Sequence, residues 1–80
     1  MKPNEQLLLS KLAAAHGGPY NPNRADAVDR IAHRHGINEK RALYLCEKWE
    51  ARGWWEYGIS IRSGWFTPEG YEYAKGTKGL

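Results

Sequence analysis

The chain has 80 residues, a mass of 9.1 kDa and a formal net charge of +3. This length allows one small domain and excludes a two-domain enzyme with an enclosed cleft, because a domain near this size buries only about 60–65% of its unfolded surface. The single cysteine, Cys46, excludes a disulfide framework and predicts a reducing, cytoplasmic location. Ten residues are aromatic, four of them tryptophan, and nine of the ten lie between Tyr44 and Tyr73.

Neither a membrane-spanning segment nor a secretion signal is predicted. The longest comparable apolar run, Leu7–Leu9, ends at Ser10 and Lys11, whereas a membrane-spanning helix needs about 20 apolar residues. The N-terminal residues also lack the apolar core of a signal peptide. We therefore expect a protein that has no membrane contact.

The first predicted element is a helix over residues 4–16. Leu8, Leu12 and Ala15 recur there at helical spacing, which indicates one apolar face directed at a core. Gly17 and the residues that follow it end the pattern, since glycine and proline favour turns over helix. A turn-rich connection then leads to the next periodic segment.

Two further helices are predicted over residues 24–35 and 39–52. Gly36 suits the left-handed residue after the first of them, and Asn38 suits the N-cap of the second. A turn of only three residues, Gly36 to Asn38, therefore joins them, which is typical of a helix-turn-helix. The apolar stripe of the helix over 39–52 consists of Ala42, Leu45, Cys46 and Trp49.

The remainder of the chain changes character. Residues 54–66 are rich in aromatic and β-branched side chains and predict a β-hairpin. Its turn is either a tight one at Ser63 and Gly64 or a longer loop from Gly58 to Ser63. A last short helix is predicted over residues 68–75, followed by a tail over residues 76–80.

Three motifs in this order resemble the winged helix-turn-helix family. Residues 30–38 follow its pattern of an apolar residue, an alanine, three variable residues, a glycine, an aliphatic residue and a polar cap. Residues 45–55 look like the end of a recognition helix that leads into a wing, and residues 65–74 look like the exit from that wing. The resemblance implies an α+β fold in a single domain over residues 1–80, with a three-helix bundle, a β-hairpin wing and a short C-terminal helix.

The same resemblance implies a partner, double-stranded DNA. In this family the third helix lies in the major groove and the wing contacts the backbone or the minor groove. The residues carried over by position are Asn38, Glu39, Lys40, Arg41, Tyr44, Lys48 and, in the wing, Arg62. Lysine and arginine suit phosphates and guanine edges. The implied function is sequence-specific or architectural DNA binding by a transcriptional regulator, or by an accessory factor of a phage or other mobile element.

The alternative is a protein-interaction module, such as a phage-encoded inhibitor or an assembly factor. The third helix and the hairpin carry little net charge, and the hairpin is rich in tryptophan. Because Trp54 and Trp55 point to opposite sides of an extended strand, we expect one of them to be exposed and to bind a protein partner. Exposed aromatics would also suit single-stranded nucleic acid. A homodimer would use the first helix, the hairpin or the tail.

No catalytic residue, metal site or cofactor is predicted. His33 and His35 are two positions apart on a helix and point about 200° apart, which is poor geometry for chelation. Cys46 belongs to the apolar stripe, and a buried thiol is a poor nucleophile. We therefore expect a binding protein and not an enzyme.

Overall fold

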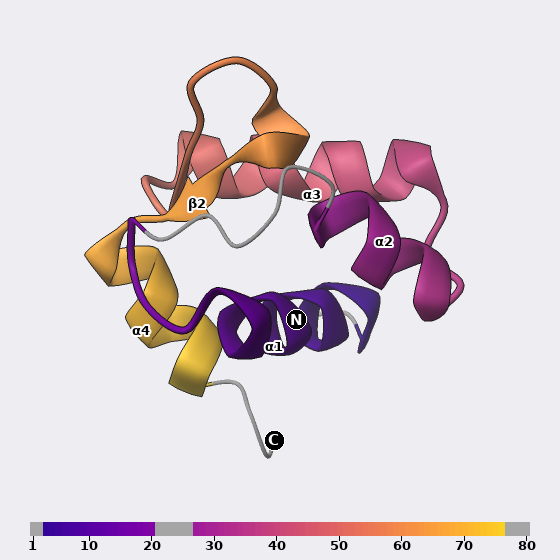
Figure 1. Ribbon diagram of the computed structural model, residues 1–80, viewed down its shortest axis with the longest axis horizontal. Helices are drawn as coiled ribbons and strands as arrows, with labels where there is room; N and C mark the ends of the chain where they lie inside the picture. The colour runs from indigo at the N-terminus through magenta and orange to yellow at the C-terminus, as the bar shows by residue number, and fades with distance from the viewer. Residues whose placement is uncertain (1–2, 21–26, 77–80) are drawn as a thin grey trace.

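The computed structural model describes residues 3–20 and 27–76. Its elements in chain order are α1 (Pro3–His16), α2 (Ala27–Arg34), α3 (Glu39–Ala51), β1 (Trp55–Glu56), a 3-10 helix η1 (Ile61–Ser63), β2 (Trp65–Phe66) and α4 (Pro68–Gly76). The protein is a small α+β domain in which α1 and α3 lie on opposite sides of the core (Figure 1). This layout is compatible with a winged helix. None of the described helices is long and apolar enough to cross a membrane.

The predicted helices lie close to the observed ones. α1 begins one residue earlier than predicted, α2 and α3 each end one residue earlier, and α4 ends one residue later. The predicted start of the second helix at residue 24, and most of the tail, lie outside the described residues. The predicted cap of α3 is confirmed, since the Asn38 side-chain oxygen accepts a hydrogen bond of 2.8 Å from the Arg41 N–H.

The hairpin is shorter than predicted. β1 and β2 are antiparallel, with Trp55 opposite Phe66 and Glu56 opposite Trp65. The first of the two predicted turns, a tight one at Ser63 and Gly64, is wrong. The chain instead forms the longer loop, in which residues 61–63 form η1. The indole N–H of Trp55 donates to the Ile61 carbonyl at 2.6 Å, so this part of the loop folds back instead of extending the ladder.

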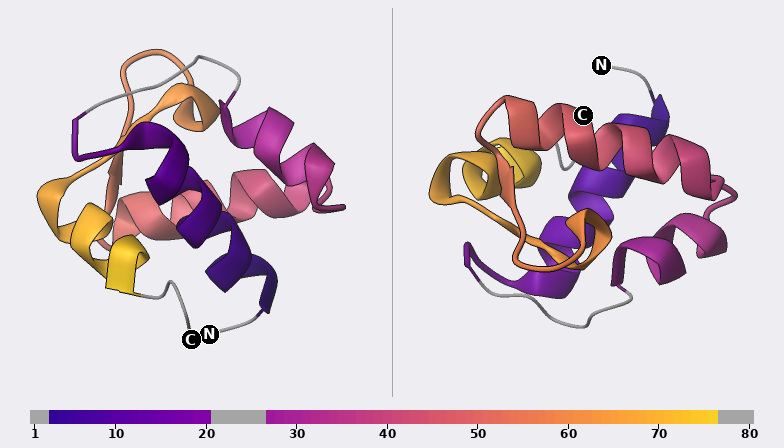
Figure 2. Two further views of the ribbon diagram at one scale, coloured as in Figure 1. Left: turned by 60° about the horizontal axis from the view of Figure 1, so that its bottom comes forward. Right: turned by 90° about the horizontal axis from the view of Figure 1, so that it is seen from above.

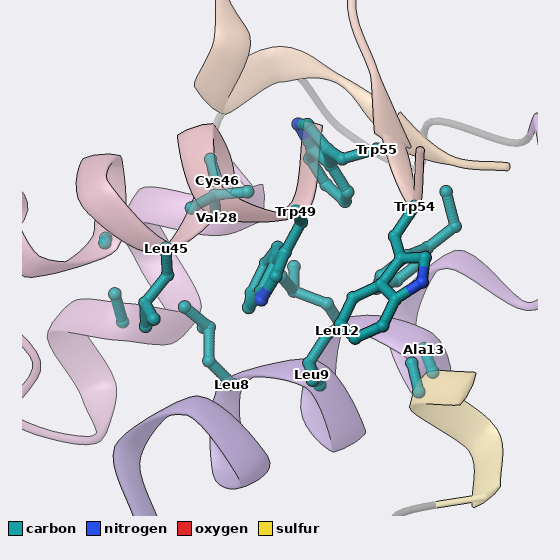
Figure 3. Packing of buried hydrophobic residues seen from close by; sticks show 14 of the residues in the cluster. Leu8, Leu9, Leu12, Ala13, Val28, Leu45, Cys46, Trp49, Trp54 and Trp55 are labelled. Carbon is teal, nitrogen blue, oxygen red and sulfur yellow. The ribbon is translucent and has the colours of Figure 1, made fainter. Parts of the chain in front are cut away.

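Trp49 of α3 lies at the centre of the core, between the hairpin and the leucines of α1 (Figure 3). It is fully buried, as are Leu8, Leu9 and Leu12. Its ring centroid lies 5.9 Å from that of Trp55 in an edge-to-face arrangement. Large aromatic side chains bury much apolar area per residue, which suits a small domain with little interior.

The expectation that Trp54 or Trp55 is exposed is wrong. Trp55 faces the core and is 1% exposed, while Trp54 is 8% exposed. The two side chains point to opposite sides of the strand, and both are buried because α4 covers Trp54 on the side away from Trp55. The Tyr73 ring stacks on Trp54 at a centroid distance of 4.0 Å, and the Arg52 guanidinium lies 5.2 Å from the Trp54 ring. Neither tryptophan is therefore available as an exposed protein-binding residue.

His16, at the end of α1, is buried against the hairpin, which the sequence pattern did not predict. Its ring lies 5.8 Å from that of Trp55 and 5.7 Å from that of Phe66. Burial among aromatic rings disfavours the charged imidazolium and lowers the pKa of His16 below its ordinary value of 6.5. The neutral form of this side chain therefore belongs to the folded state.

Substitution of Gly70 should show how closely α4 packs on the hairpin. A Cβ atom at this position would collide with the backbone carbonyl of Trp54. We expect Gly70→Ala to lower the free energy of unfolding by about 2 kcal/mol or more, because backbone cannot move aside as a flexible side chain can. Urea denaturation followed by tryptophan fluorescence measures this. Gly76→Ala is the matched control, since a Cβ there meets no atom within 4 Å; equal effects of the two substitutions would contradict the packing.

The pH dependence of stability should report on His16. Below pH 6.5, His16 is protonated in the unfolded chain but stays neutral in the folded chain until a lower pH. The free energy of unfolding should therefore fall as the pH drops below 6.5, and this contribution should be fully present above pH 6.5. The slope is at most about 1.4 kcal/mol per pH unit. His16→Leu should flatten the curve between about pH 7.5 and 5.5, whatever its effect on absolute stability. The exposed pair His33→Gln/His35→Gln is the control, and a curve flattened by that pair instead would rule out His16 as the cause.

Candidate nucleic-acid interface

The solvent side of α3 forms a surface that no other described element covers. Ala42, Leu45, Cys46 and Trp49 are directed into the core, as predicted. Seen from above, α3 lies in front of α1, with α2 and the hairpin beside it (Figure 2, right). We call the exposed side of its N-terminal half the α3 face, which comprises Asn38, Glu39, Lys40, Arg41 and Tyr44.

The turn between α2 and α3 fixes the direction of this helix. Gly36 has a φ of +73°, a conformation that other residues rarely adopt. The N–H of Ile37 donates to the carbonyl of Ala32 at 2.8 Å, and both side chains are buried. Gly36 therefore has the left-handed conformation that the sequence predicted, Ile37 is buried in the turn, and the small Ala32 side chain lets the two helices approach.

A hollow of about 770 Å³ lies beside the α3 face, between α2 and the start of α3. It is lined by Asp29, Arg30, Ala32, His33, Ile37, Asn38, Glu39 and Lys40. The lining contains cations and carboxylates in similar number. Arg30 and Lys40 are exposed cations that form no ion pair within the described ranges 3–20 and 27–76. Their charges are thus directed to solvent at the mouth of the hollow.

Lys40, Arg41 and Tyr44 lie together on the α3 face. Lys40 is exposed, and Tyr44 is 53% exposed. Arg41 is half-buried, with its guanidinium carbon 5.4 Å from the centroid of the Tyr44 ring. This cation–π contact reduces the freedom of the long arginine side chain and holds its charge above the helix surface.

Lys48, which the family resemblance implies to lie in the DNA groove, forms an ion pair with α1. Its Nζ lies 2.9 Å from Oε1 of Glu5 on α1, while Oε2 of Glu5 accepts a hydrogen bond of 2.9 Å from the Trp49 indole N–H. Burial of the Glu5 carboxyl acts to raise its pKa, but the bonds from Lys48 and Trp49 and the charges of Lys48 and Arg52 outweigh it and lower the pKa below 4.5. The carboxylate is therefore a charged group that ties α1 to α3.

Arg62 is likewise engaged by the protein itself. Its Nη1 lies 3.2 Å from the Asp29 carboxylate of α2 and 4.0 Å from that of Glu39 at the start of α3. These contacts tie η1 to both helices of the helix-turn-helix and balance the guanidinium charge. Arg62 thus lies near the α3 face, but less of its charge is available to a phosphate than that of Lys40.

Cys46 is fully buried, as predicted. Burial, together with the nearby Asp29 carboxylate, raises the pKa of its thiol to about 12. The thiolate that a nucleophile or metal ligand requires is therefore strongly disfavoured. Across residues 3–20 and 27–76, no three histidine, cysteine or acidic side chains lie together as a metal site would require.

Glu5 should matter more for its bond to Trp49 than for its pairing with Lys48. Glu5→Ala leaves the buried indole N–H without its acceptor and should lower the free energy of unfolding by about 2–4 kcal/mol. Glu5→Gln keeps an amide oxygen for the indole, and Lys48 can turn to solvent, so we expect about 1 kcal/mol. Urea denaturation measures both. Glu72→Gln, which breaks an exposed pair with Lys75, is the control, and an alanine variant as stable as the glutamine variant would contradict the dominance of the indole bond.

No model of a known protein family matches the chain, and comparisons with curated proteins and with solved structures give no match either.

Proposed function

We propose that this protein binds double-stranded DNA and that the α3 face is the contact surface. The observation that carries the proposal is that exposed Lys40 and Tyr44 and half-buried Arg41 lie together on one side of a helix that the rest of the fold leaves uncovered. A helix presented in this way fits the major groove, which admits an α-helix and offers base edges and flanking phosphates.

Each residue of the α3 face has a distinct part in the proposed contact. Lys40 binds a backbone phosphate, which fixes position without reading sequence. Arg41, steadied above the Tyr44 ring, is suited to a guanine edge because its planar fork matches two acceptors. The side-chain oxygen of Asn38 already accepts the capping hydrogen bond, so the Asn38 side chain contacts DNA through the N–H groups of its amide. Glu39 repels phosphate and shapes selectivity more than affinity.

The proposal gives Lys48 and Arg62 lesser roles than the family resemblance implies. Lys48 neutralises Glu5, and Arg62 neutralises Asp29 and contacts Glu39. Both cations would lose these partners, or share them, to bind a phosphate. Their function in DNA binding is therefore to hold α3 and the loop in place, and affinity depends mainly on Lys40 and Arg41.

Fluorescence anisotropy with a labelled duplex of mixed sequence tests the proposal. We expect binding at about 50 mM salt, where phosphate contacts are strongest. Lys40→Ala/Arg41→Ala should weaken it by about tenfold or more and reduce the dependence of log affinity on log salt by about 2. Lys40 is exposed, and half-buried Arg41 is not part of the hydrophobic core, so circular dichroism and urea denaturation should show a folded variant.

Lys11→Ala is the matched control, because Lys11 is exposed on α1, across the core from α3. It removes one positive charge and should change affinity only slightly. Absence of binding by the wild-type protein at about 50 mM salt would refute the proposed function. An equal loss of affinity in the Lys11 variant would show that net charge matters and not the α3 face.

A further inference from the structure

A second hollow lies at the other end of α3, where the helix meets the outer side of the hairpin. It has a volume of about 420 Å³ and is lined by Glu50, Glu56, Tyr57 and Trp65. Glu56 and Trp65 are cross-strand partners, so their side chains share one side of the hairpin. That side points outward because Trp55 and Phe66, the neighbouring pair, fill the core. We call this site the Trp65 hollow.

The two rings of the Trp65 hollow have no cation over them, whereas three other aromatic rings of this chain do. Arg41 lies over Tyr44, Arg52 over Trp54 and Lys75 over Tyr71, at 5.2 to 5.6 Å from the ring centroids. Among residues 3–20 and 27–76, no cation lies in this way over Tyr57, which is 44% exposed, or over the half-buried Trp65. Two partly exposed aromatic rings without a cation over them thus line one place on the surface.

The two carboxylates of the Trp65 hollow are also without a cation. Glu50 and Glu56 are exposed, and neither forms an ion pair with a residue that the structure describes. Two negative charges therefore remain uncompensated next to two aromatic rings, in a chain whose net charge is +3. Like charges placed close together are unfavourable unless a cation joins them.

We propose that the Trp65 hollow binds an arginine side chain presented by a partner protein. A guanidinium is flat, stacks on an indole ring and donates several N–H groups to carboxylates, so it satisfies both halves of this lining at once. An ammonium group offers charge but neither the flat face nor the fork. Phosphate is excluded by the two carboxylates, so this contact lies outside the proposed DNA interface and does not depend on it.

Titration with N-acetyl-arginine amide, followed by the indole N–H signals in NMR spectra, tests the proposal. This probe is one positively charged side chain without charged termini, and N-acetyl-citrulline amide is its neutral analogue of the same shape. We expect the Trp65 signal to shift with a dissociation constant on the order of 10 mM, as suits a single side chain. The signals of Trp49 and Trp55 should stay, because their N–H groups are bound inside the protein. Trp65→Phe identifies the signal.

Glu50→Gln/Glu56→Gln should weaken arginine binding by about fivefold or more, since charged acceptors strengthen such contacts. These side chains are exposed, so the variant should fold, and retention of the wild-type indole spectrum checks this. Glu47→Gln, an exposed carboxylate on α3 outside the hollow, is the control and should leave binding unchanged. Equal shifts with the citrulline probe, equal binding of N-acetyl-lysine amide, or an equal loss in the Glu47 variant would each overturn the assignment.

Discussion

Trp49 donates its indole N–H to the buried carboxylate of Glu5, and the rest of the structure depends on this contact between α3 and α1. A domain of 80 residues has room for little interior, and the large Trp49 ring lies at its centre. The ring carries a polar group that must be satisfied once it is buried. Glu5 satisfies it and is in turn neutralised by Lys48. The central ring, the crossing of two helices and the position of the α3 face are therefore set together.

The parts of the fold that depend on neighbouring residues were predictable from the sequence. Helical spacing identified the buried stripe of α3, and the preference of Asn38 for a cap located its start. Contacts between distant residues were not predictable. Glu5 and Trp49 are 44 positions apart, and no local pattern marks the glutamate as buried. The exposure of Trp54 or Trp55 was predicted wrongly for the same reason, since Tyr73, on a later helix, covers Trp54 while Trp55 lies in the core.

The candidate site shows the same division between local and distant contacts. The sequence placed Lys40, Arg41 and Lys48 on one side of a helix, and all three do belong to α3. Helical position alone could not separate cations directed to solvent from cations that the fold uses. Lys48 binds Glu5 from α1, whereas Lys40 forms no ion pair within the described residues. The electrostatic surface of a small protein therefore follows from which charges its own fold neutralises.

Three exposed charges of α3 oppose its macrodipole. Acidic groups stabilise the start of a helix and basic groups its end, each by about 0.3–1 kcal/mol. Glu39 and Lys48 follow this rule, and each takes part in an ion pair within the fold. Lys40 near the start and Glu47 and Glu50 near the end oppose it, and these three are exposed without such pairs in the described part of the chain. Stability does not account for charges at unfavourable ends of a helix. The two proposed partners would account for them, because a phosphate backbone at the start of the helix and a guanidinium near its end have the opposite sign.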